Sequence, residues 1–250
     1  MGDLLLKAAI IVLNGLLWFV FILIAFLFFL GAVVIRVTTW PFDPNLRFLH
    51  QYSCVWASVY LWLNPFWSLK KSGLKNVDPK KSYVIVSNHQ SWADILVLFN
   101  TFIHFKWVSK KSVFNAPFLG WNMRLNGYVP IHRGNDASRE KCMDLCREWL
   151  AKGSSVLFFP EGTRSLERGK MLPFKIGAFK LAMESRRDVL PIVIRGSIDA
   201  IPKDSILLHR KSRMSVEVLP PVSIDSFLGN ASGVESLMNH VRIQMNRKLG

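Results

Sequence analysis

Two short polar stretches of this chain carry residue types that acid–base chemistry needs. The first reads NHQSWAD at residues 88–94 and follows an apolar, β-branched run. An aspartate that accepts one imidazole N–H fixes the histidine tautomer, leaves the other nitrogen free to take a proton and favours the imidazolium that forms. His89 is therefore a candidate general base, and Asp94 is the candidate residue that orients it.

This pairing requires a change of secondary structure between the two residues. Within one helix, residues five apart point about 140° away from each other. The run at residues 83–86 predicts a strand and the apolar pattern from Trp92 predicts a helix, which places His89 in the turn and Asp94 in the first helical turn. The same spacing also arises by chance, and Asp94 would then only place a negative charge near a helix N-terminus.

A second stretch, FFPEGTRS at residues 158–165, also follows an apolar run and then turns sharply. Together the two stretches resemble the glycerolipid acyltransferase family typified by 1-acylglycerol-3-phosphate acyltransferases. The signatures of that family are Asn-His followed by four residues and Asp, and Phe-Pro-Glu-Gly-Thr-Arg-Ser, and both are complete here. The resemblance implies transfer of a long-chain acyl group from acyl-CoA or acyl carrier protein to the sn-2 hydroxyl of lysophosphatidic acid, without a cofactor or an enzyme nucleophile.

The resemblance also implies which residues bind the acceptor. In the family's second motif an arginine after a short apolar strand meets the acceptor's phosphate, and Arg133 matches it. The third motif, assigned to glycerol phosphate, comprises Glu161, Gly162, Thr163 and Arg164; Glu161 either binds the glycerol or holds the neighbouring cations in place. Lys110 is a further phosphate contact, although Ser109 stands where the family has alanine. An arginine fork suits phosphate because it donates two parallel hydrogen bonds. Backbone N–H groups after His89 are candidates for stabilising the oxyanion.

The composition indicates an anionic partner. Lys and Arg number 32 against 17 Asp and Glu, which gives a formal net charge of +15. Nucleic acid and an anionic membrane both suit such a charge. Nine Trp and eighteen Phe favour the membrane, and no nucleic-acid-binding signature accompanies the basic residues. The three cysteines make no disulfide framework, and Cys142 and Cys146 lack the further ligands that a metal site needs.

The N-terminal part predicts a membrane anchor. Residues 8–35 carry no charge and exceed the roughly 20 residues that cross a bilayer as a helix. Arg36 and Arg47 follow this run, which favours a cytoplasmic position for the rest of the chain. Residues 52–67 are either a core helix or the second arm of a hairpin at the membrane interface. Three Trp and two Tyr in this segment favour the interfacial arm.

The remaining chain predicts an α/β fold with a mixed sheet flanked by helices. We expect residues 1–68 to form the membrane-anchoring helices and residues 69–250 to form the acyltransferase domain. Helices are expected at 138–152 and 233–248. Strands are expected at residues 83–86, 105–109, 127–131, 155–159, 190–194 and 214–219.

Two other functions remain open from the sequence. One keeps the chemistry and changes the acceptor to another lysophospholipid or a lyso-aminolipid. The other is a catalytically silent membrane-interaction protein, against which the intact His89 and Asp94 argue. His132 is a second candidate for the base, but no carboxylate is evidently paired with it. The other four histidines show no partner pattern and are expected to be ordinary surface or core residues: His50, His104, His209 and His240.

Overall fold

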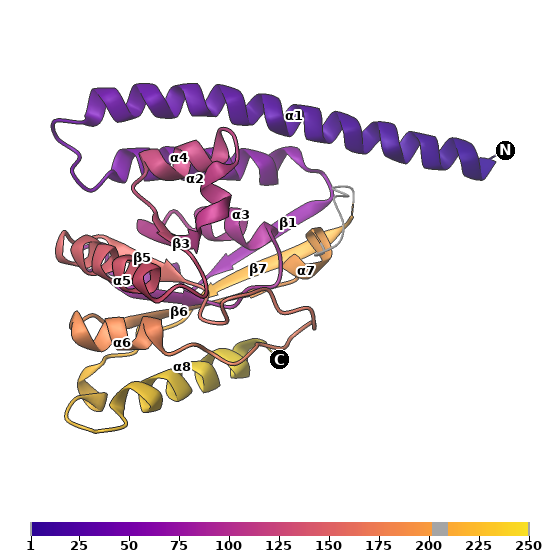
Figure 1. The fold of residues 1–250 in the computed structure, drawn as a ribbon. Helices are drawn as coiled ribbons and strands as arrows, with labels where there is room; N and C mark the ends of the chain where they lie inside the picture. Colours follow the sequence, from indigo (N-terminus) through magenta and orange to yellow (C-terminus); the bar gives the residue numbers. More distant parts are fainter. Residues whose placement is uncertain (1, 202–209, 250) are drawn as a thin grey trace.

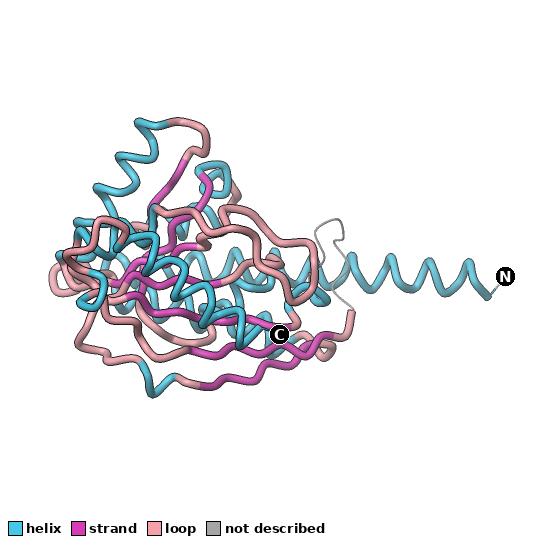
Figure 2. Tube along the Cα trace, turned by 90° about the horizontal axis from the view of Figure 1, so that it is seen from below, coloured by secondary structure: helices cyan, strands magenta, loops and turns pink. Residues whose placement is uncertain are grey.

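The computed structural model describes residues 2–201 and 210–249, with side chains described from residue 8. The long helix α1 (Gly2–Thr39) is followed by α2 (Arg47–Leu63), and strands and helices then alternate along the chain. The other helices are α3 (Ala93–Phe99), α4 (Leu119–Leu125), α5 (Asp136–Ala151), α6 (Gly177–Glu184), α7 (Ser197–Ala200) and α8 (Gly233–Leu249). Figures 1 and 2 show the N-terminal part of α1 extending beyond the rest of the molecule.

The described strands form one seven-stranded sheet in the order β1-β7-β6-β2-β5-β3-β4. All neighbouring strands are parallel except β6 and β7, so the sheet is mixed as predicted. The carboxyl ends of β2 to β6 therefore lie at one edge, where α/β proteins build sites. The strands are β1 (Trp67–Ser72), β2 (Val84–Ser87), β3 (Phe105–Lys110), β4 (Val129–Ile131), β5 (Ser155–Phe158), β6 (Val189–Arg195) and β7 (Ser212–Val218).

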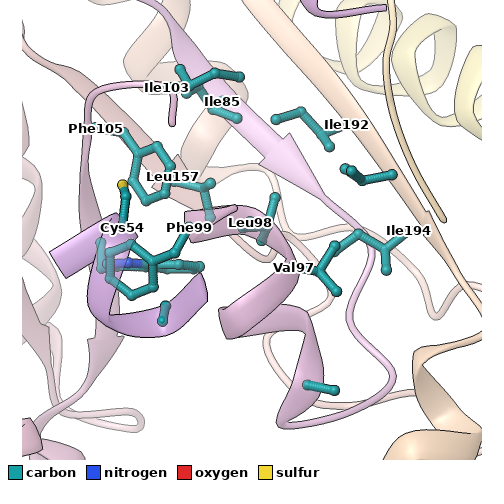
Figure 3. Close-up of a cluster of buried hydrophobic side chains, with 14 of the residues drawn as sticks. Cys54, Ile85, Val97, Leu98, Phe99, Ile103, Phe105, Leu157, Ile192 and Ile194 are labelled. Carbon is teal, nitrogen blue, oxygen red and sulfur yellow. The ribbon is translucent and has the colours of Figure 1, made fainter. Parts of the chain in front are cut away.

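The central strands are buried on both faces because helices cover each side of the sheet (Figure 1). Side chains alternate across a strand, so Ile85 of β2 joins the core on the α2 and α3 side, whereas Val84 and Val86 join the core with α5, α6 and α8. Figure 3 shows the first core, in which Cys54 of α2 and Phe99 of α3 pack against Phe105 of β3. This two-sided burial explains why the strands appear in the sequence as continuous apolar runs.

The helix α1 lies along α2 and α4 (Figure 1). Its inner side contacts aromatic residues of α2: Phe21 lies 4.4 Å from Tyr60 and Phe28 lies 5.3 Å from Tyr52, measured between ring centroids. Gly31 allows the close approach, because a Cβ there would lie 2.1 Å from the Tyr52 Oη atom. The outer side leaves an apolar surface exposed, and Ala8–Thr39 is long and apolar enough to cross a membrane, with 6% of its most apolar window buried.

The structure confirms one long apolar N-terminal helix and changes the interpretation of the segment after it. We predicted that residues 52–67 form an interfacial arm rather than a core helix. In the structure α2 has a buried face that joins the core through Cys54, Ala57 and Leu61, while Trp62 and Leu63 are exposed. Aromatic composition did not separate the two alternatives because the same residue types suit a core and an interface.

The predicted strands correspond to β2 to β7, and the predicted C-terminal helix corresponds to α8. One strand was missed. Residues 67–72 form β1, which pairs with β7 at the edge of the sheet, whereas the sequence analysis placed a domain boundary at residue 69. This strand has one buried residue, Trp67, and is otherwise largely polar, which is typical of an exposed edge strand.

The difference in burial predicts that two leucines contribute very differently to the free energy of unfolding. Leu157 of β5 is completely buried, whereas Leu166 is 58% exposed. We expect Leu157→Ala to lower the free energy of unfolding by about 2–5 kcal/mol, because the cavity left in the sheet core cannot fully collapse. Leu166→Ala is the matched control and should change it by less than about 0.5 kcal/mol. Chemical unfolding in detergent, followed by circular dichroism, measures both; equal effects would contradict this description of the core.

Candidate active site

The predicted contact between His89 and Asp94 is present at the carboxyl end of β2. His89 follows the strand in the turn, and Asp94 lies in the first turn of α3. The His89 Nδ1 atom lies 2.8 Å from Asp94 Oδ2; the histidine side chain is 14% exposed and the aspartate is buried. With Nδ1–H donated to the carboxylate, Nε2 is the nitrogen left to accept a proton, and it makes no hydrogen bond to any residue that the structure describes.

Asp94 also fixes the backbone of the turn. Its Oδ2 atom accepts hydrogen bonds from the backbone N–H groups of Gln90 at 2.7 Å and Ser91 at 2.9 Å. The backbone N–H of Ala93 donates to the Ser91 hydroxyl. The N–H groups of Gln90, Ser91 and Ala93 were among the candidates for stabilising an oxyanion, and the structure shows that these three are already paired. The turn therefore holds the imidazole rather than offering these donors to a substrate.

Glu161 connects the His89 turn to a second loop. Its Oε1 atom accepts the backbone N–H of His89 at 2.8 Å, and its Oε2 atom accepts the backbone N–H of Leu172 at 2.7 Å. The residue is 4% exposed. The pKa of Glu161 is raised to about 7: burial is the main cause, the two backbone hydrogen bonds oppose it, and the nearby Asp94 adds to the increase. Both carboxylate oxygens are thus occupied by main-chain donors.

The FPEGTRS segment folds into a tight turn against His89. The Gly162 N–H donates to the Phe159 carbonyl, and the φ of Gly162 is +71°, a conformation that favours glycine. The Ser165 N–H donates to the carbonyl of His89 at 2.8 Å. The Phe159 ring stacks on the imidazole with 3.9 Å between the ring centroids. The two sequence motifs therefore form one structure at the sheet edge.

The predicted cations surround this edge. Arg164 is half-buried, and its guanidinium lies 5.2 Å from the centroid of the Trp92 ring. Its Nη1 atom is buried and has no hydrogen-bond partner among the described residues. Lys110 ends β3 and Arg133 lies two residues after β4; both are exposed, and the two strands are neighbours. Thr163 is exposed as well. Each of these groups is available to an anionic ligand.

Several contacts that order the site were missed from the sequence. The side chain of Asn88 donates to the carbonyl of Ile194 and accepts the Ile194 N–H, both at 2.8 Å, which fixes the turn to β6. The stacking of Phe159 and the donor at Leu172 were also missed. Asn88 and Phe159 belong to the recognised motifs, so the sequence marked them as candidates for the site. The contact of the Leu172 N–H could not be predicted, because every residue type except proline has this backbone group.

None of the other histidines that the structure describes forms a comparable pair with a carboxylate. His132 is exposed, and its described hydrogen bond is made by the backbone. His50 is buried, with Nδ1 2.9 Å from the Tyr128 hydroxyl and Nε2 2.9 Å from the Ile103 carbonyl. His104 lies 3.0 Å from Ser154 Oγ. His240 lies beside Phe227, and His209 lies outside the described residues. Cys142 and Cys146 are buried on α5.

Comparison with known proteins identifies the family of this chain. The sequence model of the Acyltransferase family matches residues 68–195, which contain both motifs. The chain belongs to the acyltransferase family. The chloroplastic 1-acyl-sn-glycerol-3-phosphate acyltransferase LPAT1 of Arabidopsis thaliana is 39% identical over 70% of this chain and 49% of its own length. The 1-acyl-sn-glycerol-3-phosphate acyltransferase of Limnanthes douglasii is 30% identical over 79% of this chain and 69% of its own length.

This member of the acyltransferase family also resembles a solved structure in fold. The crystal structure of the 1-acyl-sn-glycerophosphate acyltransferase PlsC from Thermotoga maritima superposes with a TM-score of 0.72 at 21% identity, covering 95% of this chain and 96% of that one. The chain spans 49%, 59% and 58% of the length of three curated relatives, from Arabidopsis thaliana, Chlamydomonas reinhardtii and Brassica napus. The family model and these relatives together establish the family.

The raised pKa of Glu161 predicts a pH-dependent stability. Because the folded protein keeps this proton to about pH 7 and the unfolded chain loses it near its usual value of 4.5, the free energy of unfolding should fall as the pH rises between these values. Glu161→Gln cannot titrate and should lack this part of the decrease. Urea unfolding of both proteins at several pH values between 4.5 and 8 provides the measurement. Parallel curves for the two proteins would show that Glu161 does not titrate in this range.

Proposed function

We propose that this chain is a 1-acylglycerol-3-phosphate O-acyltransferase that converts lysophosphatidic acid to phosphatidic acid. One observation carries the proposal: the His89–Asp94 pair, with Nε2 free of described partners, stands at the same sheet edge as the cationic side chains of Arg164, Lys110 and Arg133. A base beside unpaired cations suits an acceptor that carries both a hydroxyl and a phosphate. The names of the relatives and the family match support the same assignment.

The chemistry follows from the protonation of the imidazole. The Nε2 atom of His89 removes the proton of the sn-2 hydroxyl while that oxygen attacks the carbonyl carbon of the acyl thioester. Asp94 stabilises the imidazolium that forms. The tetrahedral intermediate then expels the thiolate of coenzyme A or of acyl carrier protein, which takes the proton from His89. An enzyme nucleophile is unnecessary, because the thioester is already activated.

The phosphate of the acceptor is proposed to lie among Arg164, Arg133 and Lys110. The buried Nη1 donor of Arg164 lacks a described acceptor, and a phosphate oxygen would supply one. The two exposed cations at the ends of β3 and β4 would complete the binding of the doubly charged group. Gly162 and Thr163 belong to the turn that carries Arg164, so they are proposed to contact the glycerol phosphate.

For Glu161 we favour a positioning role within the substrate-binding motif. Both of its carboxylate oxygens accept backbone N–H groups, one of which belongs to His89 itself. An ionised carboxylate accepts both bonds well, whereas a protonated one has a single good acceptor oxygen. Glu161 would therefore hold the imidazole and the 161–172 loop in place relative to each other. The acceptor would contact the residues next to Glu161 in the motif and not Glu161 itself.

The long apolar helix indicates association with a membrane, which is where a lysolipid acceptor resides. We propose that the outer side of α1 and the exposed end of α2 contact the lipid, with residues 1–68 as the anchoring part and 69–250 as the acyltransferase domain. The catalytic domain is proposed to lie on the cytoplasmic side, because Arg36 and Arg47 follow the apolar run. The excess of basic residues favours an anionic membrane surface.

The direct test is acyl transfer by the detergent-solubilised protein with long-chain acyl-CoA, and in parallel with acyl carrier protein, as donor. We expect turnover with lysophosphatidic acid, and a fall of at least roughly 10²–10⁴-fold in His89→Ala, since that is the usual contribution of a general base. Binding of lysophosphatidic acid should persist in the variant. His132→Ala is the matched control and should retain activity.

Each alternative has its own outcome in this assay. Preference for another lysophospholipid or a lyso-aminolipid in a parallel panel would replace the acceptor and leave the mechanism in place. Absence of transfer with both donors would favour the catalytically silent membrane-interaction protein. Wild-type turnover by His89→Ala would disprove the assignment of the base.

Glu161→Gln separates positioning from acceptor binding. The amide oxygen can still accept one backbone N–H, but the amide nitrogen faces the second donor, so the His89 turn should shift. We expect kcat to fall on the order of 10²-fold, with a KM for lysophosphatidic acid close to that of the wild type. Thr163→Ala serves as the comparison for a binding residue and should act mainly on KM. A large rise of KM at unchanged kcat in Glu161→Gln would assign Glu161 to acceptor binding instead.

A further inference from the structure

A second cationic site lies at the bend between α1 and α2, away from the catalytic edge. A cavity of about 300 Å³ is lined there by Arg36, Trp40, Asp43, Arg124 and Trp149, among others. We refer to it as the elbow cavity. Gly127, which precedes β4, also lines it, so the cavity lies near the amino end of that strand, whereas Arg133 follows its carboxyl end.

The charge around the elbow cavity is strongly positive. Arg36 and Arg124 line it, and Lys106 is completely buried next to it, with Nζ 4.2 Å from the centroid of the Trp149 ring. Asp43 is the carboxylate that lines the cavity; its two oxygens accept the backbone N–H groups of residues 47 and 48 at 2.8 Å each, and it forms no ion pair with any described residue. Burial is the main cause that lowers the pKa of Lys106 to about 7; the charge of Asp43 raises this pKa, and the nearby arginines and Lys152 lower it.

The two arginines that line the cavity are available to a ligand. The Arg36 guanidinium lies 4.6 Å from the centroid of the Trp40 ring and makes no ion pair with any described residue. Arg124 donates to the Phe114 carbonyl and to Asn115 Oδ1, and no described carboxylate pairs with it. A phosphate suits this pair, because the Arg36 guanidinium can donate two parallel hydrogen bonds to its oxygens and the Nη1 atom of Arg124 donates to no described acceptor.

The surroundings indicate that this phosphate belongs to a lipid. Near the end of α1 that precedes the bend, Val34 and Val37 are 60% and 68% exposed. Trp40 and Phe42 follow at 69% and 64% exposed, and tryptophan is enriched at the headgroup level of membranes. The basic cavity suits the phosphate of a phospholipid headgroup, and the exposed apolar side of α1 suits its acyl chains.

We propose that the elbow cavity binds the phosphate of an anionic phospholipid whose acyl chains lie along the outer side of α1. The proposal rests on the membrane association proposed above and is independent of the acyl transfer reaction. Bound lipid would hold the bend between α1 and α2 at the headgroup level. It would also supply the anionic partner that Arg36 and Arg124 lack among the described residues.

Native mass spectrometry of the full chain in detergent tests this site. Phosphatidylglycerol and phosphatidylcholine with identical acyl chains are added together at equal concentration. We expect the wild type to retain phosphatidylglycerol with a preference on the order of tenfold, and Arg36→Gln with Arg124→Gln to lose that preference. The pair Arg139→Gln and Arg247→Gln removes two charges from exposed helix positions and should behave like the wild type.

Three further measurements keep the result decisive. Arg36→Gln alone removes no described hydrogen bond, so it carries the test if the double variant does not fold. Millimolar inorganic phosphate should leave the lipid bound, because it lacks acyl chains; displacement would assign the site to free phosphate and overturn the lipid assignment. An unchanged preference for phosphatidylglycerol in both arginine variants would likewise overturn it. Flotation of the wild type with phosphatidylcholine vesicles tests membrane association separately.

Discussion

The carboxylate of Asp94 gathers three N–H groups onto one oxygen, and the candidate site depends on this arrangement. The imidazole of His89 and the backbone of the two following residues converge on Oδ2, which fixes both the tautomer and the path of the turn. From the other side, Glu161 accepts the backbone N–H of His89. Two buried carboxylates thus hold one residue, one through its side chain and one through its main chain. Little freedom remains for the imidazole, and a general base benefits from such pre-organisation.

The same arrangement has an energetic consequence. Asp94 and Glu161 are both buried, and their proximity adds to the effect of burial in raising the pKa of Glu161. Ionised Glu161 is therefore unfavourable for folding, yet it is the ionised form that accepts both backbone donors well. Ionisation of Glu161 therefore favours the ordered site but lowers the free energy of unfolding. Such a conflict is common at functional sites and rare in a core that serves packing alone.

The sequence predicted the His89–Asp94 contact better than it predicted the edge of the sheet. The His89–Asp94 contact was predictable because a strand-to-helix change brings residues five apart together, and the buried strands were predictable from apolar runs. Residues 67–72 have no such run, since their strand character comes from pairing with β7. The buried and exposed faces of α2 could not be predicted either, because the same aromatic residues suit contact with lipid and packing in a core. The contact between Glu161 and the Leu172 backbone depends on a loop path, which residue types do not encode.

The buried face of α2 reaches the candidate catalytic histidine through a series of aromatic contacts. Between ring centroids, His50 lies 4.8 Å from Phe105, Phe105 lies 5.0 Å from Trp107, Trp107 lies 5.7 Å from Phe159, and Phe159 lies 3.9 Å from His89. Rings packed at the density of a protein interior cannot shift independently. The position of α2 therefore constrains Phe159, on which the imidazole rests. The helix for which we predicted a position at the membrane interface thus also supports the candidate site from within the core.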